Sequence, residues 1–163
     1  LFALKAAAES KNVKALILFS PFAKFTSAEN YEAQDREAVS TMKKHLASNP
    51  EALLKSFWRR MAKPENFTIE MPKVINTEKL AEGLDILASF DVRGLLCQVK
   101  APTLILQGSS DMINSCAMAS YVKEKLPDAE LVIFENSGHA LPFTKTDECI
   151  LRIKNFLEGI LKK

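Results

Sequence analysis

The amino-acid sequence predicts an α/β protein in which helices flank a small parallel β-sheet. Three short apolar runs, at residues 14–20, 103–107 and 130–134, are each bounded by proline, glycine or charged residues, which is typical of buried parallel strands. Helical patterns separate these runs, and such alternation indicates a layered α/β fold. The last two runs are also followed by an aspartate and a histidine, so reactive groups lie beyond the carboxyl ends of two predicted strands.

Composition is that of an ordinary globular domain. The chain has 163 residues, of which 47% are hydrophobic and 26% charged, and its net charge of +2 indicates neither nucleic acid nor a membrane as an obligatory partner. The three cysteines, Cys97, Cys116 and Cys149, form no C-x-x-C pattern, so we interpret them as reduced thiols of a cytoplasmic protein. With two histidines and no signal-peptide pattern, we expect no metal, no cofactor and no secretion.

Residues 1–24 are assigned to the core of the fold. The alanine-rich segment at residues 1–10 lacks glycine and proline and therefore favours a helix. No capping residue precedes this segment, so the sequence predicts that the helix starts further upstream. The apolar run Lys14–Ser20 follows as a strand and ends at Pro21.

Residues 25–93 interrupt the alternation with three helical patterns and are interpreted as a cap, or lid, over the sheet. The first pattern covers Ala28–Ser48, the second begins at Asn49-Pro50, and the third covers Thr77–Phe90. Asparagine followed by proline is a clear helix start. The alternative is that these helices simply cover the sheet without forming a lid.

Residues 94–163 return to the core pattern. A strand over 103–107 is followed by a helix over Ser115–Leu126, a strand over 130–134 and a final helix over Thr144–Leu161. The expected product is a sheet of three parallel strands with flanking helices and an inserted helical cap.

Asp111 and His139 are the candidate catalytic residues. Alone, Asp111 is better interpreted as a turn or N-cap residue, whereas His139 is equally well interpreted as a loop histidine bonded to the backbone. Together they favour catalysis, because one strand-helix-strand unit brings the ends of neighbouring strands close together. A carboxylate in that position orients a histidine base and stabilises its charged form.

These segments resemble a known superfamily. The stretch Pro102-Thr-Leu-Ile-Leu-Gln-Gly-Ser-Ser-Asp111, followed by Ser137-Gly-His-Ala140, is similar to the acid and base motifs of the α/β-hydrolases. The segment from Gly83 to Arg93, together with Phe19-Ser-Pro-Phe22, resembles the pimeloyl-acyl-carrier-protein methyl ester esterases of biotin synthesis. The resemblance extends over essentially the whole chain.

The resemblance implies a serine carboxylesterase with a Ser-His-Asp triad. Asp111 would be its acid and His139 its base, and no cofactor would be needed. Phe22 would contact substrate, and basic residues of the cap would bind an acidic acyl carrier protein: Lys55, Arg59, Arg60 and Lys63. A solvated helix face is the alternative interpretation of these four basic residues.

The sequence departs from this family in one respect. No G-x-S-x-G turn, which carries the nucleophilic serine of the family, is present. We therefore expect that the serine lies just upstream of residue 1, that this polypeptide alone is inactive, and that it either requires another segment or self-associates through an unpaired sheet edge. Another capped hydrolase, or a non-catalytic binding module, is the alternative to an esterase.

Overall fold

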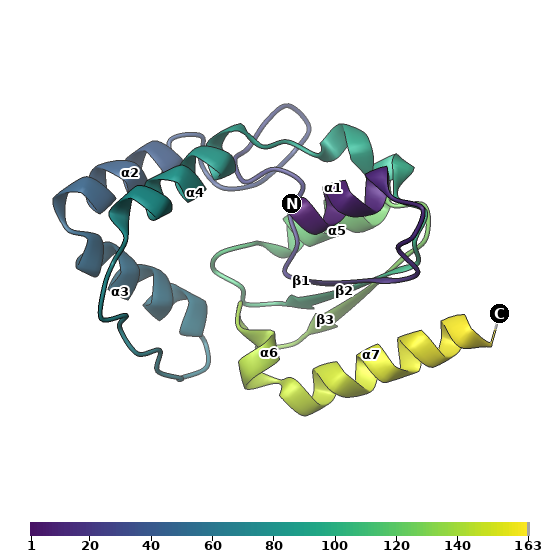
Figure 1. Ribbon diagram of the computed structural model, residues 1–163. Coiled ribbons are helices and arrows are strands. Elements are labelled where there is room, and N and C mark those ends of the chain that lie inside the picture. The colour runs from purple at the N-terminus through teal and green to yellow at the C-terminus, as the bar shows by residue number, and fades with distance from the viewer. Residues whose placement is uncertain (163) are drawn as a thin grey trace.

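The computed structural model describes residues 1–162 and shows a three-stranded parallel sheet flanked by helices (Figure 1). The elements in chain order are α1 (Phe2–Glu9), β1 (Leu16–Phe19), α2 (Ala38–Ser48), α3 (Pro50–Ala62), α4 (Thr77–Ser89), the 3-10 helix η1 (Arg93–Gln98), β2 (Thr103–Gly108), α5 (Cys116–Lys125), β3 (Ala129–Phe134), α6 (Leu141–Thr144) and α7 (Thr146–Leu161). The α/β fold predicted from the sequence, with three parallel strands and flanking helices, is confirmed.

Strand β2 is the centre of the sheet. The strand order is β1-β2-β3, with Phe19 beside Leu106 at one junction and Gly108 beside Phe134 at the other. All six residues of β2 are buried, because the strand has a neighbour on both sides and helices over both faces. This environment explains why its sequence is predominantly apolar.

Alternate residues of β2 enter two separate cores. Ile105 packs on the face covered by α1, η1 and α5, with Leu4, Leu96 and Val122. Leu104 and Leu106 face α6 and α7 on the other side, where they form a smaller cluster with buried Leu141 and Cys149. The sheet is thus the middle layer of a three-layer arrangement (Figure 1).

Helices α2, α3 and α4 form a group of their own to one side of the sheet, with α2 packed against both of the others (Figure 1). The predicted start of α3 is confirmed, since the Asn49 side chain accepts a hydrogen bond from the Ala52 amide at 3.0 Å. Asn76 begins α4 in the same way, accepting from the Lys79 amide at 2.9 Å.

The prediction of a helix from Ala28 is wrong, because α2 begins only at Ala38. The preceding residues form bridges, Ala28 with Tyr31 and Thr26 with Gln34, around a turn in which Asn30 has φ 53°. The cause is tertiary: Tyr31 is buried and its hydroxyl donates to the Lys24 carbonyl at 2.7 Å. A local helical pattern does not anticipate an anchor of this kind.

The carboxyl-terminal region also differs from the sequence prediction, but by less. The sequence predicts one helix from Thr144, whereas the structure has a short α6 followed by α7 from Thr146. Only Cys149 of α7 is fully buried, and several of its large apolar side chains are substantially exposed. The apolar side chains of α7 are therefore only partly covered by the other described residues.

Candidate active site

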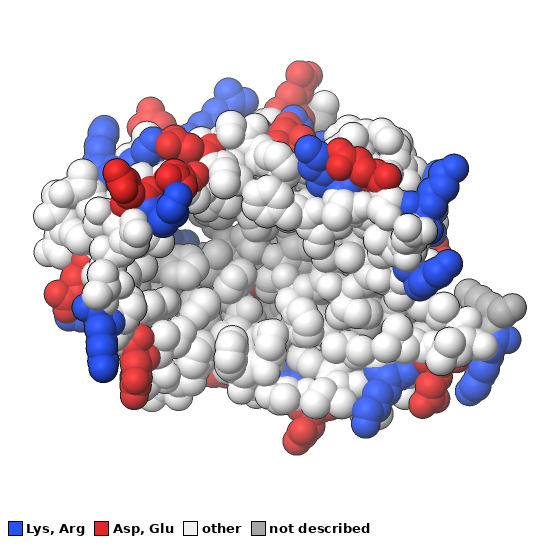
Figure 2. Space-filling model, viewed as in Figure 1, with Lys and Arg blue, Asp and Glu red and all other residues white. Residues whose placement is uncertain are grey.

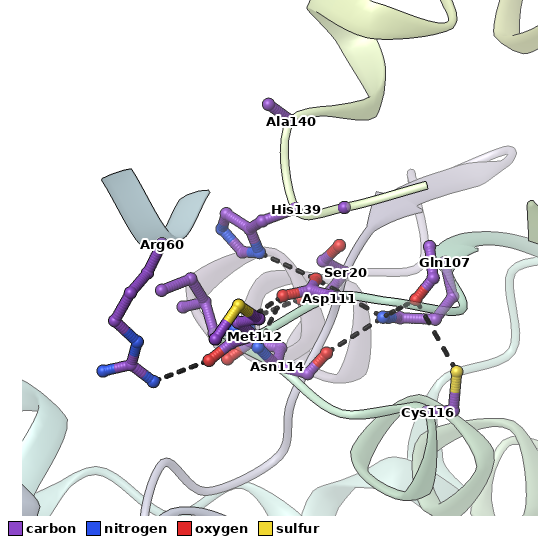
Figure 3. A network of polar contacts seen from close by, with 12 residues as sticks. Ser20, Arg60, Gln107, Asp111, Met112, Asn114, Cys116, His139 and Ala140 are labelled. Atoms are coloured by element: carbon purple, nitrogen blue, oxygen red, sulfur yellow. Dashed lines mark hydrogen bonds and ion pairs between the residues drawn. The ribbon is translucent and has the colours of Figure 1, made fainter. Parts of the chain in front are cut away.

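Asp111 and His139 contact each other beyond the carboxyl ends of β2 and β3 (Figure 3). The pairing of Gly108 with Phe134 places the two following loops side by side. In these loops the His139 Nδ1 atom lies 2.8 Å from the Asp111 Oδ2 atom. The Asp111 side chain is completely buried, whereas 22% of the His139 side chain is exposed. The aspartate is therefore held inside the protein while the imidazole can meet a ligand.

The acid and base loops are linked by their own backbones. Asn136, with φ 54°, donates its amide to the Ser109 hydroxyl at 2.9 Å, and the Ser110 amide donates to the Ser137 carbonyl at 2.9 Å. The loops come so close that a Cβ atom at Gly108 would collide with the Ser137 carbonyl. Glycine at this position is a packing requirement of the site.

Three groups besides the histidine hold the Asp111 carboxylate. Its Oδ1 atom accepts from the amides of Ile113 at 2.8 Å and Asn114 at 2.9 Å, and Oδ2 also accepts from the Gln107 side-chain amide at 3.3 Å. Burial raises the pKa of Asp111, but the hydrogen bond and charge of His139, with the Asn114 amide, outweigh it and hold the pKa below its ordinary value. Asp111 is thus held as an acceptor.

The polar residues behind Asp111 were not singled out from the sequence. Gln107 is fully buried, and its amide also donates to the Asn114 carbonyl at 2.9 Å. Buried Asn114 in turn donates to the carbonyl of Ser20 at 2.7 Å, and Ser20 directly follows β1 with φ 45° (Figure 3). The sequence offered one signal for this network, which was a glutamine inside an otherwise apolar strand. A side-chain amide buried in a strand must find hydrogen-bond partners, so its neighbours are expected to be polar.

A cavity of about 400 Å³ separates the Asp111–His139 pair from the cap helices. His139 and Asn114 lie at its core side, and nearly all of the remaining lining is apolar. Figure 2 shows a hollow in this region with charged residues at its rim. The other lining residues are Phe22, Phe25, Met42, Leu46, Leu53, Leu54, Phe57, Lys79, Leu80, Gly83, Leu84, Leu87 and Ile113.

The other predicted site residues fall into two groups. Phe22 lines the cavity together with His139. The four basic residues lie on or just after α3 and are exposed: Lys55, Arg59, Arg60 and Lys63. Lys55 is paired with Glu51 at 2.6 Å, and Arg60 donates from Nη2 to the Met112 carbonyl at 2.6 Å. Arg60 therefore contacts the acid loop and does not simply face solvent.

Residues 1–162 contain neither a metal-binding cluster nor a membrane-spanning helix. No group of three or more histidine, cysteine, aspartate or glutamate side chains in this range is arranged to hold a metal ion. No helix in the same range has the length and apolar character needed to cross a bilayer.

The fold and this site define a class of protein. A parallel sheet whose strand ends present an aspartate and a histidine, below helices inserted between strands, is the arrangement of the α/β-hydrolases. The chain is an α/β-hydrolase-fold protein. Within that class its sequence resembles the pimeloyl-[acyl-carrier protein] methyl ester esterases, as the motifs predicted.

Two such esterases illustrate the sequence similarity. The chain is 28% identical over 165 residues to the enzyme from Neisseria meningitidis, a match that covers 95% of this chain and 64% of the relative. It is 41% identical over 69 residues to the enzyme from Nitrosomonas europaea, covering 42% of this chain and 27% of the relative. The search against family models returned no match.

Solved structures show the same fold. An esterase from Exiguobacterium antarcticum superposes with a TM-score of 0.82 at 21% identity, covering 94% of this chain and 62% of that one. An enol-lactonase from Burkholderia xenovorans gives 0.77 at 16% identity, covering 96% of this chain and 61% of that one. The chain thus spans less than two thirds of the length of each of these relatives.

Proposed function

We propose that the chain carries the acid, the base and the cap of a serine carboxylesterase. The observation that carries this proposal is the 2.8 Å contact between Asp111 Oδ2 and His139 Nδ1, with His139 lining an apolar cavity. A buried carboxylate bonded to one imidazole nitrogen, with the other nitrogen free to meet a substrate, is what a histidine base in acyl transfer requires.

The carboxylate sets the tautomer of the base. An ionised carboxylate only accepts hydrogen bonds, so Nδ1 of His139 carries a proton and donates it to Asp111. In the neutral ring, Nε2 is then unprotonated and is the atom able to take a proton from a hydroxyl. Asp111 also stabilises the imidazolium formed in that step.

The proposed nucleophile is a serine encoded upstream of residue 1, because the sequence contains no G-x-S-x-G turn. Its hydroxyl would lose its proton to His139 and form an ester bond to the acyl carbon. The alcohol, methanol for a methyl ester, would leave with that proton. Water would then hydrolyse the acyl-enzyme with His139 as base again.

The cavity and the sequence relatives support an ester with an apolar acyl chain. An almost wholly apolar lining favours hydrocarbon, and relatives named pimeloyl-[acyl-carrier protein] methyl ester esterase suggest that ester. We propose that this reaction belongs to biotin synthesis in the cytoplasm. The basic residues Lys55, Arg59, Arg60 and Lys63 would meet the acidic carrier. No metal or other cofactor enters this scheme.

The test uses the protein expressed from its whole coding sequence. We expect turnover of p-nitrophenyl butyrate and labelling of a serine by a fluorophosphonate, with His139→Ala reducing kcat by about 10⁴-fold. His45→Ala, at the other histidine of the chain, is the matched control and should retain activity. The 163-residue polypeptide alone should be inactive.

Two results would overturn this proposal. One is serine-dependent turnover by the 163-residue polypeptide itself. The other is a coding sequence with no G-x-S-x-G upstream of Leu1, which would favour a binding module.

Binding of the carrier has its own test. The double substitution Lys55→Glu with Arg59→Glu should weaken binding of acyl carrier protein while leaving hydrolysis of p-nitrophenyl butyrate unchanged. Unchanged carrier binding would mean that these residues form a solvated helix face.

A further inference from the structure

The segment that leads out of α3 lies directly on the loops that carry Asp111 and His139. We call residues 60–67 the strap. Its first contact is with the acid loop, where Arg60 Nη2 donates to the Met112 carbonyl at 2.6 Å. Its second is with the base loop, where the Gly138 amide donates to Glu65 Oε2 at 3.0 Å. One short segment of the cap thus contacts the residue after Asp111 and the residue before His139.

The contact with the base loop is a close approach of two backbones. A Cβ atom at Gly138 would collide with the Lys63 carbonyl oxygen, so the strap can lie there only because residue 138 is glycine. On its other side the same loop lies against Gly108, where a Cβ atom would collide with the carbonyls of Ser137 and Gly138. The base loop is therefore held between β2 and the strap.

Glu65 contacts the base loop through only one of its two carboxylate oxygens. Its Oε2 atom bonds the Gly138 amide, while its Oε1 atom is buried and has no hydrogen-bond partner within residues 1–162. Withdrawing a carboxylate oxygen from water without a hydrogen-bond partner has a free-energy cost. A charged acceptor makes a stronger bond to a backbone amide than a neutral one, which suits a loop that must stay in place.

An aromatic contact extends the same interface. Phe67 of the strap stacks on Phe143 of α6 with ring centroids 6.2 Å apart and an interplanar angle of 18°. Helix α6 begins two residues after His139, so this contact lies on the far side of the base loop. The strap therefore contacts the histidine segment both before and after His139.

We propose that Glu65 and Arg60 are positioning residues that lock the base and acid loops to the cap, so that cap placement sets the alignment of His139 with Asp111. This inference rests on the proposed function, because the position of His139 matters for catalysis only if the protein is an esterase. The alignment of His139 with Asp111 can nevertheless be measured without a catalytic assay.

The experiment follows two NMR signals in the protein expressed from its whole coding sequence. One is the low-field proton of the His139 Nδ1–H···Asp111 bond, assigned by its absence in His139→Gln. The other is hydrogen exchange of the Gly138 amide. Glu65→Ala should broaden or remove the first signal and speed the exchange by about tenfold or more, since a hydrogen bond to a charged group is lost.

Matched variants separate positioning from general loosening. Glu65→Gln keeps an acceptor oxygen and should restore the low-field proton and most of the exchange protection. Glu70→Ala removes an exposed acid of the same connector and should change neither signal. Arg60→Ala should disturb the low-field proton, while Arg59→Ala should not. If Glu65→Ala fails to fold, the comparison of Arg60→Ala with Arg59→Ala still decides the question.

The outcomes distinguish this inference from the proposed function. An unchanged low-field proton and unchanged Gly138 exchange in a folded Glu65→Ala protein would overturn the inference, even if the protein is an esterase. Altered NMR signals in a protein without esterase activity would support the positioning role and overturn the proposed function. In an active esterase, Glu65→Ala should lower kcat more than it raises KM, and Glu65→Gln should restore kcat.

Discussion

Asp111 shows how a single residue is prepared for one role. It accepts from two backbone amides, from Gln107 and from His139, and every one of these bonds favours its ionised form. Burial acts in the opposite direction, yet the pKa of Asp111 stays below its ordinary value. The same contacts that orient the histidine therefore also contribute to stability.

The pH dependence of stability tests this balance. In the unfolded chain an aspartate titrates near pKa ~3.9, and the folded pKa of Asp111 lies lower. The ionised carboxylate therefore stabilises the fold above that pH, and the contribution is lost as pH falls through the lowered pKa. We predict that Asp111→Asn reduces the free energy of unfolding most near neutral pH and that the difference shrinks below pH ~4.

Urea denaturation of the wild type and Asp111→Asn across this range measures that difference. The remaining carboxylates titrate in both proteins and cancel in the comparison. A difference that stays constant from neutral to acid pH would show that the Asp111 carboxylate is not held in its ionised form by the fold.

At the scale of elements, helix α3 connects the cap to the site. Its start is fixed by Asn49 and its exposed face carries basic residues, while its end leads into the segment that contacts Gly138. Leu53, Leu54 and Phe57 of the same helix line the cavity. Any change in the stability of α3 is therefore expected to reach both the cavity wall and the His139 loop.

The N-cap of α3 gives a prediction at this scale. Asn49→Ala removes the acceptor for the Ala52 amide and should lower the free energy of unfolding by about 1 kcal/mol. Asn49→Asp keeps an acceptor oxygen and should retain most of the stability. Chemical denaturation of the three proteins measures this, and equal stability of all three would mean that the cap bond is not formed in solution.

At the scale of the whole molecule, two parts of the described structure, the edge of β1 and the outer face of α7, leave apolar residues uncovered. Strand β1 has a neighbour only on its β2 side within residues 1–162, and its last residue, Phe19, is 36% exposed. Helix α7 adds the exposed side chains of Ile150, Leu151, Leu157 and Leu161. Unpaired strand edges and apolar patches favour association with another chain or segment.

We predict that the 163-residue polypeptide self-associates through these exposed apolar surfaces. Size-exclusion chromatography with light scattering should give a mass above that of one chain, and Leu151→Lys should shift the population toward the monomer. Ser40→Lys, at an exposed position of α2, is the control and should leave the distribution unchanged. A stable monomer in the unmodified polypeptide would contradict the prediction.

Several features of this protein follow from the sequence alone. The three strands are short apolar runs between breakers, and burial makes such runs recognisable. The contact partners Asp111 and His139 could be proposed because one strand-helix-strand unit separates them. The start of α3 was readable because its capping residue, Asn49, is adjacent in sequence.

Other features were decided only by the tertiary structure, because they depend on contacts between residues that no local sequence pattern relates. The segment before α2 is not helical, since a buried Tyr31 anchors it to Lys24. Arg60 and Glu65 contact the loops that carry Asp111 and His139 across 52 and 73 residues of sequence, and these contacts depend on where helix α3 ends in space. Local propensity determined the elements, whereas long-range packing determined which polar groups meet around His139.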